Sequence, residues 1–289
     1  MSCRPQRTLK KKVSFSGVGI HTGKEVSLSF CPAPEHSGIV FQRVDLPGKP
    51  TIPAEVEYVQ DTSRCTTIGV GSCQVLTVEH VLAALYAYQI DNLCIQVSEG
   101  EPPVGDGSSK PFVAMIEEAG IEEQESVTSV AFLKQPVSFT QGDTHLVALP
   151  SEEYRVSYTL HYPNTPVIRS QYYSLSIDAH SFKEEIAPCR TFALYEEITK
   201  LMECGLIRGG SLENAVVIKD DVIFSKEGLR FPNEMARHKI LDLIGDLSLV
   251  GIPFVAHIIA IRSGHTSNVG LARELGKEFS QNLREVSCQ

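Results

Sequence analysis

Two stretches of the chain carry the same succession of β-prone runs and turn residues. The string LKKKVSF at residues 9–15 returns as LKQPVSF at residues 133–139. Each copy is followed by a polar turn, a second β-prone run, a break that contains proline, and a further β-prone run. Such runs, separated by Gly, Pro and Asp, predict hairpins. The repeat therefore predicts one fold used twice, and a chance match of short strings is the alternative.

A helix with a histidine near its start is predicted later in each half. The first has the sequence EHVLAAL at residues 79–85, and the second has RHKILDL at residues 237–243. Around the first, the apolar positions have the spacing of one buried helix face, and they are Val78, Val81, Leu82 and Leu85. If the halves pack about an approximate two-fold axis, the two histidines approach one another.

The polar and acidic segment at residues 120–128 lies between the two repeats and is the expected domain boundary. Strands followed by helices in each half predict an α+β protein, a duplicated sandwich of sheets and helices. We expect an N-terminal α+β domain at residues 1–126 and a C-terminal α+β domain at residues 127–289. A chain of 289 residues is long enough for two cores of ordinary size.

Composition and charge narrow the classes of function. With 42% hydrophobic and 21% charged residues, the composition is that of a globular protein rather than a disordered one. The formal net charge of -9 argues against a nucleic-acid partner, because proteins that bind a phosphate backbone present a basic face to it. Any phosphate group in a ligand must therefore be bound by a local group of basic residues.

The apolar segments predict a cytoplasmic protein without a transmembrane segment. Residues 1–15 are basic but lack the apolar stretch of a secretory signal. The most apolar run, at residues 249–261, is interrupted by Pro253 and His257 and is too short to cross a bilayer, so we expect a buried strand there. The eight cysteines include no CxxC pair, which favours reduced, buried thiols over a disulfide framework or a zinc ribbon. No obligate protein partner is evident.

The first candidates for chemistry are the neighbours Glu79 and His80. Thr77 is the expected N-cap, which puts both residues in the first helical turn, where backbone N–H groups favour an ionised carboxylate. Adjacent residues diverge by about 100° around a helix, so His80 can bind a metal while Glu79 reaches a water beside it. The alternative is a solvated carboxylate next to a hydrogen-bonded histidine.

The second candidates are His238 and Asp242, which are one helical turn apart and project from one face. Nitrogen and carboxylate ligands suit zinc. Asp246 lies a further turn along the helix, and Lys239 lies to one side of the pair. The other residues of this helix are apolar and imply burial, so the histidine and the aspartate need partners inside the fold. An ordinary ion pair is the alternative.

The third candidate is His265, in a glycine-containing loop at residues 261–268. A histidine in a loop is accessible to a ligand and is a candidate proton donor. The alternative is a polar turn residue that precedes the final helix, with Ser267 or Asn268 as the cap of that helix.

Six motifs together resemble the UDP-3-O-acyl-N-acetylglucosamine deacetylase family. They are GVGIHTG at 17–23, TVEHVLAAL at 77–85, CRTFALYEE at 189–197, GGSLENAVV at 209–217, HKILDLIGDL at 238–247 and SGHTSN at 263–268. Their order and spacing match the family, and the resemblance covers nearly the whole chain. It implies a zinc-dependent hydrolase of early lipid A biosynthesis, in which two similar α+β domains enclose the active site between them.

The resemblance also implies a role for each candidate. The zinc ligands would be His80, His238 and Asp242, with the fourth position left for a water whose pKa falls from about 16 to about 7. Glu79 would take the proton of that water as it attacks the acetamide carbonyl of the substrate.

Further residues would act on the later steps by the same resemblance. Thr191 would stabilise the oxyanion together with zinc. His265 would protonate the leaving glucosamine nitrogen, and Asp246 would raise the pKa of His265 by a hydrogen bond. Lys239 would add positive charge near the substrate.

The substrate itself, a lipid-linked nucleotide sugar, requires two kinds of subsite. The resemblance places the diphosphate beside Lys239 and Arg262. It places the acyl chain in an apolar passage near Ile20, Phe192, Ile198 and Val216. Two residues depart from the family pattern: Arg262 stands where lysine is expected, and Arg64 occupies an apolar family position, so both bear on substrate and inhibitor fit.

Two other classes of function stay open at this point. A zinc peptidase or another amidohydrolase could use the same metal chemistry on a non-nucleotide substrate, although the apolar passage and the basic cleft would then have no use. A structural zinc protein or a binding protein requires a closed fourth ligand, and no cysteine adjoins the proposed metal motifs.

Overall fold

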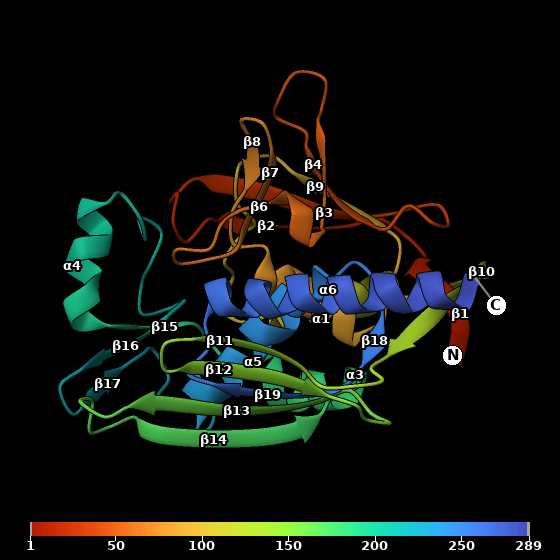
Figure 1. Ribbon diagram of the computed structural model, residues 1–289. Helices are drawn as coiled ribbons and strands as arrows, with labels where there is room; N and C mark the ends of the chain where they lie inside the picture. The colour runs from red at the N-terminus through yellow and green to blue at the C-terminus, as the bar shows by residue number, and fades with distance from the viewer. Residues whose placement is uncertain (1, 288–289) are drawn as a thin grey trace.

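The computed structural model describes residues 2–287, and this part of the chain is an α+β protein with six α-helices and five sheets. Two five-stranded sheets form the outer layers of the body, and helices α1, α5 and α6 lie between them (Figure 1). The helix bounds are α1 Glu79–Ala87, α2 Lys110–Ala119, α3 Ala179–Ser181, α4 Tyr195–Glu203, α5 Glu234–Ser248 and α6 His265–Ser287, with single turns at Val56–Tyr58 and Phe182–Ile186.

The N-terminal half is built on a sheet with the strand order β2-β3-β9-β4-β5. All neighbours in it are antiparallel except β4 and β9, which are parallel. In β3, Val26, Leu28 and Phe30 are buried and alternate with more exposed residues, as expected for a sheet with one covered face. The strand bounds are β2 Val13–Val18, β3 Glu25–Pro32, β4 Ile39–Arg43, β5 Thr51–Pro53 and β9 Leu93–Val97.

The C-terminal half repeats this arrangement. Its sheet has the order β11-β12-β19-β13-β14, and again one pair, β13 and β19, is parallel while the other pairs are antiparallel. In each half the central strand is therefore the last of the five in the chain. The strand bounds are β11 Val137–Gln141, β12 Thr144–Leu149, β13 Arg155–Tyr162, β14 Arg169–Ser176 and β19 His257–Ile261.

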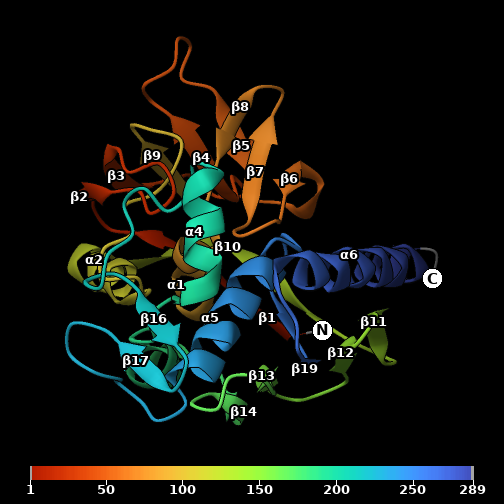
Figure 2. The same ribbon diagram turned by 90° about the vertical axis from the view of Figure 1, so that its left-hand side faces the viewer.

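Three small sheets complete the described fold. Strand β10 pairs with β1 on one side and with β18 on the other, β6-β7-β8 forms a second sheet, and β15-β16-β17 forms a third beside α4. Figure 2 turns that side to the viewer, with α4 upright in front and β16 and β17 below it. The bounds are β1 Ser2–Leu9, β6 Val59–Asp61, β7 Thr67–Val70, β8 Cys73–Val75, β10 Ile121–Phe132, β15 Phe192–Leu194, β16 Val216–Lys219, β17 Val222–Phe224 and β18 Phe254–Val255.

Helices α1 and α5 cross in direct contact at the centre of the molecule. A Cβ atom at Gly245 of α5 would lie only 2.1 Å from the carbonyl oxygen of Glu79 on α1. Only glycine allows the two backbones to come this close. The crossing brings His80 of α1 next to the face of α5 that carries His238.

Helix α1 begins where the sequence predicts, but its N-cap is different. Val78 holds the N-cap position and no side chain caps the helix. The prediction that Thr77 is the cap is wrong: Thr77 has a φ of 56°, and its hydroxyl donates to the Oε1 atom of Glu101 at 2.9 Å. Because the Thr77 hydroxyl is hydrogen-bonded to the carboxylate of the fully buried Glu101, it does not cap the N-terminus of α1.

Two linking segments differ from their expected form. Most of the acidic segment at residues 120–128, the expected domain boundary, belongs to β10, so the position between residues 126 and 127 falls inside a strand. The apolar run at residues 249–261 is two strands rather than one. Gly251 takes a φ of 81° and Pro253 lacks an N–H group, so the chain turns before it enters β18 and then β19.

The buried apolar side chains form one cluster that continues through both halves. Leu85 of α1 and Ile240 and Ile244 of α5 belong to it and are at most 1% exposed. The helix layer is thus a shared core for the two large sheets. Within residues 2–287, none of the helices combines the length and the apolar character needed to span a membrane.

Candidate metal centre and active site

Three side chains that could hold a metal converge where α1 crosses α5. His80 comes from α1, and His238 and Asp242 come from successive turns of α5. One potential ligand atom from each lies within 4.8 Å of the others, and all three residues are buried. The two imidazole rings are nearly perpendicular, with their centroids 5.1 Å apart. The predicted one-turn spacing thus places the α5 pair on one face, opposite the histidine of α1.

The surroundings of Asp242 suit a bound cation. The Oδ1 atom of Asp242 is buried without a hydrogen-bond partner, and it lies 3.3 Å from Nε2 of His238 and 3.6 Å from Nε2 of His80. An unpartnered buried carboxylate oxygen is costly unless a cation binds there. Burial alone would raise the pKa of Asp242, but His238 and Lys239 outweigh it and hold this pKa well below its ordinary range.

His238 is oriented by a backbone group. Its Nδ1 atom lies 3.1 Å from the carbonyl oxygen of Cys189, which can only accept, so Nδ1 donates and Nε2 keeps its lone pair for a metal. Burial lowers the pKa of His238 to about 4, against the opposing effect of Asp242. The ring is therefore neutral near pH 7, as a metal ligand must be.

Glu79 lies next to this trio and is 2% exposed. Its Oε2 atom accepts the backbone N–H of Thr66 at 3.1 Å. Burial raises the pKa of Glu79 to about 7, although His265 and His80 act in the opposite direction. A carboxyl group with this pKa can take up and release a proton near neutral pH.

His265 and Asp246 form a second buried pair. The Nδ1 atom of His265 lies 2.9 Å from Oδ2 of Asp246, and its Nε2 atom lies 3.9 Å from Oε1 of Glu79. Burial disfavours the charged imidazole, but Asp246 and Glu79 outweigh it and raise the pKa of His265 to about 9. His265 is the first residue of α6, so neither Ser267 nor Asn268 is the cap of that helix.

A cavity of about 910 Å³ opens onto the three potential metal ligands and onto Glu79 and His265, whereas Asp246 lies behind its wall and is fully buried. Lys239 lies in its wall and donates to Oδ2 of Asp242 at 2.8 Å. Burial acts to lower the pKa of Lys239, but Asp242 outweighs it and raises that pKa. Sequence-predicted residues that line the cavity are Ile20, Glu79, His80, Thr191, Phe192, Ile198, His238, Lys239, Asp242 and His265.

Two predicted substrate contacts lie elsewhere. Val216 does not line the cavity: it is fully buried, whereas its neighbours Ala215 and Val217 do line it. Successive side chains of a strand point to opposite faces, so Val216 faces the core. Arg262 lines an adjoining cavity of about 400 Å³, which shares Lys239 with the first, and it pairs with Asp143 at 3.3 Å.

Arg64, which departs from the family pattern, lines the large cavity. Its Nη1 atom lies 2.8 Å from Oε2 of Glu197 on α4, and both side chains are about two-fifths exposed, at 44% and 41%. The pair joins the loop before β7 to α4 across the cavity wall. Its partial exposure means that solvent screens it and that it holds the two segments weakly.

Several contributing residues were missed from sequence. The hydroxyl of Thr66 donates to Oδ1 of Asp246 at 2.5 Å while its N–H holds Glu79, so one residue links the two buried carboxylates. Asn268 donates to Oδ2 of Asp246 at 2.9 Å, and His21 lines the cavity with an unpartnered Nδ1 atom. No local sequence pattern identifies Thr66 as part of the site. His21 lies inside the GVGIHTG motif, but the motif did not single out this residue.

Two imidazoles and one carboxylate, with a second buried carboxyl group beside them in the wall of a large cavity, are typical of the class of metal-binding hydrolases. Comparison with known proteins is consistent with this class. A family model described as LpxC, UDP-3-O-acyl N-acetylglycosamine deacetylase, matches residues 6–277. The chain belongs to this deacetylase family.

Relatives named UDP-3-O-acyl-N-acetylglucosamine deacetylase are similar over almost their full length. The Chlamydia felis protein is 56% identical over 276 residues, which cover 96% of this chain and 98% of the relative. The Chlamydia pneumoniae protein is 55% identical over 273 residues, or 94% and 97% of the two chains. The protein of Chlamydia trachomatis serovar L2 is 52% identical over 272 residues, or 94% and 95%.

Proposed function

We propose that this chain hydrolyses the acetamide of UDP-3-O-acyl-N-acetylglucosamine to UDP-3-O-acyl-glucosamine and acetate, an early step of lipid A biosynthesis. The observation that carries the proposal is the convergence of His80, His238 and Asp242 around an unpartnered carboxylate oxygen at the base of a large cavity. The names of the relatives supply the substrate. The cytoplasmic location stays a prediction from sequence.

The resident metal in this proposal is zinc, held by His80, His238 and Asp242. Two imidazole nitrogens and one carboxylate oxygen are a donor set that zinc accepts, and three protein ligands leave a position open in a catalytic site. A zinc ion held there would supply Lewis acidity to the acetamide carbonyl.

Glu79 acts as the general base in this mechanism. With a pKa of about 7 it is substantially ionised near neutral pH, and it takes a proton from the attacking water as the new C–O bond forms. The Thr66 N–H fixes one carboxylate oxygen, Oε2, and the other oxygen, Oε1, points toward His265. The hydroxyl of Thr191, in the cavity wall, donates to the carbonyl oxygen as negative charge develops on it.

His265 acts as the general acid. A pKa of about 9 keeps the imidazole protonated near neutral pH, so it can donate to the glucosamine nitrogen while the C–N bond breaks. Asp246 accepts the other ring proton and holds the ring in place. The amine then leaves protonated, and acetate is the second product.

The rest of the substrate is assigned to the two adjoining cavities. The acyl chain lies along Ile20, Phe192 and Ile198 in the larger cavity. The diphosphate lies near Lys239, which lines both cavities, and Arg262, which lines the smaller one. Arginine in place of the expected lysine still binds phosphate, through a planar fork of donors.

We also propose that the two halves are duplicated domains, at residues 1–126 and 127–289. Both large sheets share one strand order and one pattern of parallel and antiparallel pairs. Helix α1 and helix α5 then occupy equivalent positions, each with a histidine near its start. A shared strand, β10, crosses the junction.

A panel of substrates tests the proposed activity. The zinc-loaded protein is incubated with UDP-3-O-acyl-N-acetylglucosamine, UDP-N-acetylglucosamine and an acetyl-lysine peptide, and acetate release is measured. We expect rapid release from the acylated nucleotide sugar only, because it alone fills both cavities. Preferred cleavage of the peptide would favour an amidohydrolase that acts on non-nucleotide substrates.

A further inference from the structure

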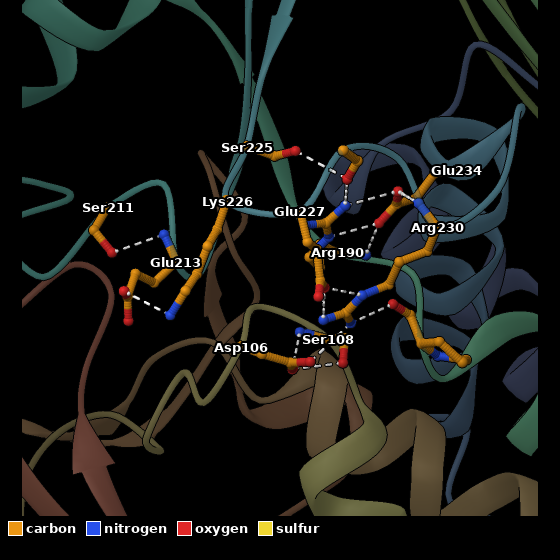
Figure 3. A network of polar contacts seen from close by, with 12 residues as sticks. Asp106, Ser108, Arg190, Ser211, Glu213, Ser225, Lys226, Glu227, Arg230 and Glu234 are labelled. Atoms are coloured by element: carbon orange, nitrogen blue, oxygen red, sulfur yellow. Dashed lines mark hydrogen bonds and ion pairs between the residues drawn. The ribbon is translucent and has the colours of Figure 1, made fainter.

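Arg190 is among the largest fully buried side chains of the described residues, and its partner is the fully buried Glu234. The Nε atom of Arg190 donates to Oε1 of Glu234 at 2.8 Å and Nη2 donates to Oε2 at 3.1 Å. The backbone N–H of Arg190 also donates to Oε1, at 3.0 Å. One carboxylate thus holds both the side chain and the backbone of Arg190, as Figure 3 shows for the two side chains.

Arg190 stands between two residues of the proposed active site. The Cys189 carbonyl orients His238, and Thr191 is the proposed oxyanion donor. Glu234 precedes His238 by four residues on α5, so it lies one turn away on the same helix face. The ion pair therefore fixes residues 189–191 against the helix that carries a metal ligand.

The same network reaches the N-terminal half. The backbone N–H of Arg230 donates to Oε2 of Glu234 at 2.7 Å, and its Nη1 atom donates to Oδ2 of Asp106 at 2.7 Å (Figure 3). The next residue, Gly107, accepts the N–H of Thr191 at 2.8 Å. A Cβ atom at Gly107 would lie 1.9 Å from the carbonyl oxygen of Asn214, so this loop packs against the backbone of the segment before β16 with no space for a side chain.

Stability alone does not explain this pair. Removing two charges from water is costly, and apolar residues of similar volume often stabilise a fold as well as a buried ion pair does. What an apolar pair cannot do is hold a backbone N–H and a guanidinium in one fixed geometry. Polar partners of this kind set the orientation of metal ligands in other metal sites.

We propose that Arg190 and Glu234 are positioning residues, which orient the His238 imidazole through the Cys189 carbonyl and place the Thr191 hydroxyl beside the substrate. This inference rests on the proposed function. It assigns to the pair no contact with the substrate or the metal.

The experiment compares Glu234→Gln with the apolar double variant Arg190→Met/Glu234→Leu. Thermal unfolding, the Zn²⁺ dissociation constant of the metal-stripped protein, kcat and KM are measured for each. We expect Glu234→Gln to bind Zn²⁺ about 10-fold more weakly and to lose about 10-fold in kcat, because the carbonyl and the hydroxyl are no longer fixed. KM stays within about twofold, since the contacts with the acyl chain and the diphosphate are intact and the Thr191 hydroxyl acts mainly in the transition state.

The double variant separates positioning from stability. We expect it to regain only part of the wild-type Tm, since the backbone N–H groups of Arg190 and Arg230 lose their acceptor, and to regain neither the zinc affinity nor kcat. If the double variant does not fold, Arg190→Lys is measured in its place. Lysine keeps the positive charge but lacks the planar set of N–H donors that binds both carboxylate oxygens. The matched control is Glu213→Gln, which breaks the exposed pair with Lys226 drawn in Figure 3 and should leave all four quantities unchanged.

Two results would overturn the inference. One is a folded Glu234→Gln variant with wild-type zinc affinity and kcat, and the other is a double variant in which both recover together with Tm. A wild-type protein that binds no zinc and releases no acetate would instead contradict the proposed function. The two failures are therefore distinguishable.

Discussion

Glu79 and His80 are neighbours in the chain, yet they are assigned different tasks. His80 offers one of the three potential ligand atoms. Glu79 accepts a hydrogen bond from the Thr66 N–H instead, and burial raises its pKa. Their directions differ because adjacent residues diverge around a helix. Because the proposed base and the proposed metal ligands are different side chains, a substitution can remove one role and leave the other intact.

We predict that Glu79→Ala keeps stoichiometric zinc while kcat falls by about 10²- to 10⁴-fold, the usual contribution of a general base. His238→Ala, by contrast, loses both metal and activity, because only two ligands remain. Metal analysis of the purified variants and the rate of acetate release check this. If Glu79→Ala releases zinc as readily as His238→Ala, the assignment of roles is wrong.

A second prediction concerns the proton donor. In the proposed mechanism His265 acts in its protonated form, so kcat should fall as the pH rises through its pKa of about 9. Asp246→Asn removes the charge that raises this pKa, and the protonated fraction is then lost at a lower pH. We expect the alkaline limb of the kcat profile to move down by about one pH unit or more. A limb that does not move would show that another group donates the proton.

The crossing of α1 and α5 holds the three ligands together. Gly245 permits this crossing, since its missing side chain leaves space for the Glu79 carbonyl. The local spacing of His238 and Asp242 follows from helix geometry alone. Their distance from His80 depends on a contact between helices far apart in the sequence.

We predict that Gly245→Ala destabilises the fold by about 1–3 kcal/mol, the cost of overpacking a close contact, and weakens zinc binding. Urea unfolding and zinc titration measure both effects. The control is Gly276→Ala in α6, where a Cβ atom meets nothing within 4 Å. This variant should gain up to about 1 kcal/mol of stability from the better helix propensity of alanine. Equal effects at both positions would mean that the crossing tolerates a side chain.

Local patterns predicted those parts of the site that short-range geometry decides. The periodicity of residues 237–243 gave a helix with His238 and Asp242 on one face, and the structure has α5 there. Thr66 could not be predicted, because only the fold brings it to Glu79 and Asp246. Val216 shows a different limit: a motif gives the strand, but the face of each side chain depends on the register.

Across the whole molecule, the site lies between two halves whose main sheets have the same topology. The repeated strings at residues 9–15 and 133–139 predicted this likeness, since each string leads into the first strand of its sheet. The strand β10 was missed, because its polar residues suggest a linker. It is stabilised by pairing with β1, which no local pattern reveals.

The large cavity gives a prediction about the substrate. Each methylene of the acyl chain buried along Ile20, Phe192 and Ile198 contributes about 0.8 kcal/mol. Shortening the chain by four methylenes should therefore remove about 3 kcal/mol of binding free energy and lower kcat/KM by about 200-fold. A series of acylated UDP sugars checks this. A constant kcat/KM along the series would mean that the acyl chain lies outside the cavity.

The central claim is that three side chains from two helices hold a metal on which hydrolysis depends. Acetate release from UDP-3-O-acyl-N-acetylglucosamine by the same preparation, before metal removal, after it, and after one equivalent of zinc is restored, tests this most directly. We predict that activity is lost with the metal and returns with it. An undiminished rate in rigorously metal-stripped protein would show that hydrolysis does not depend on this metal centre.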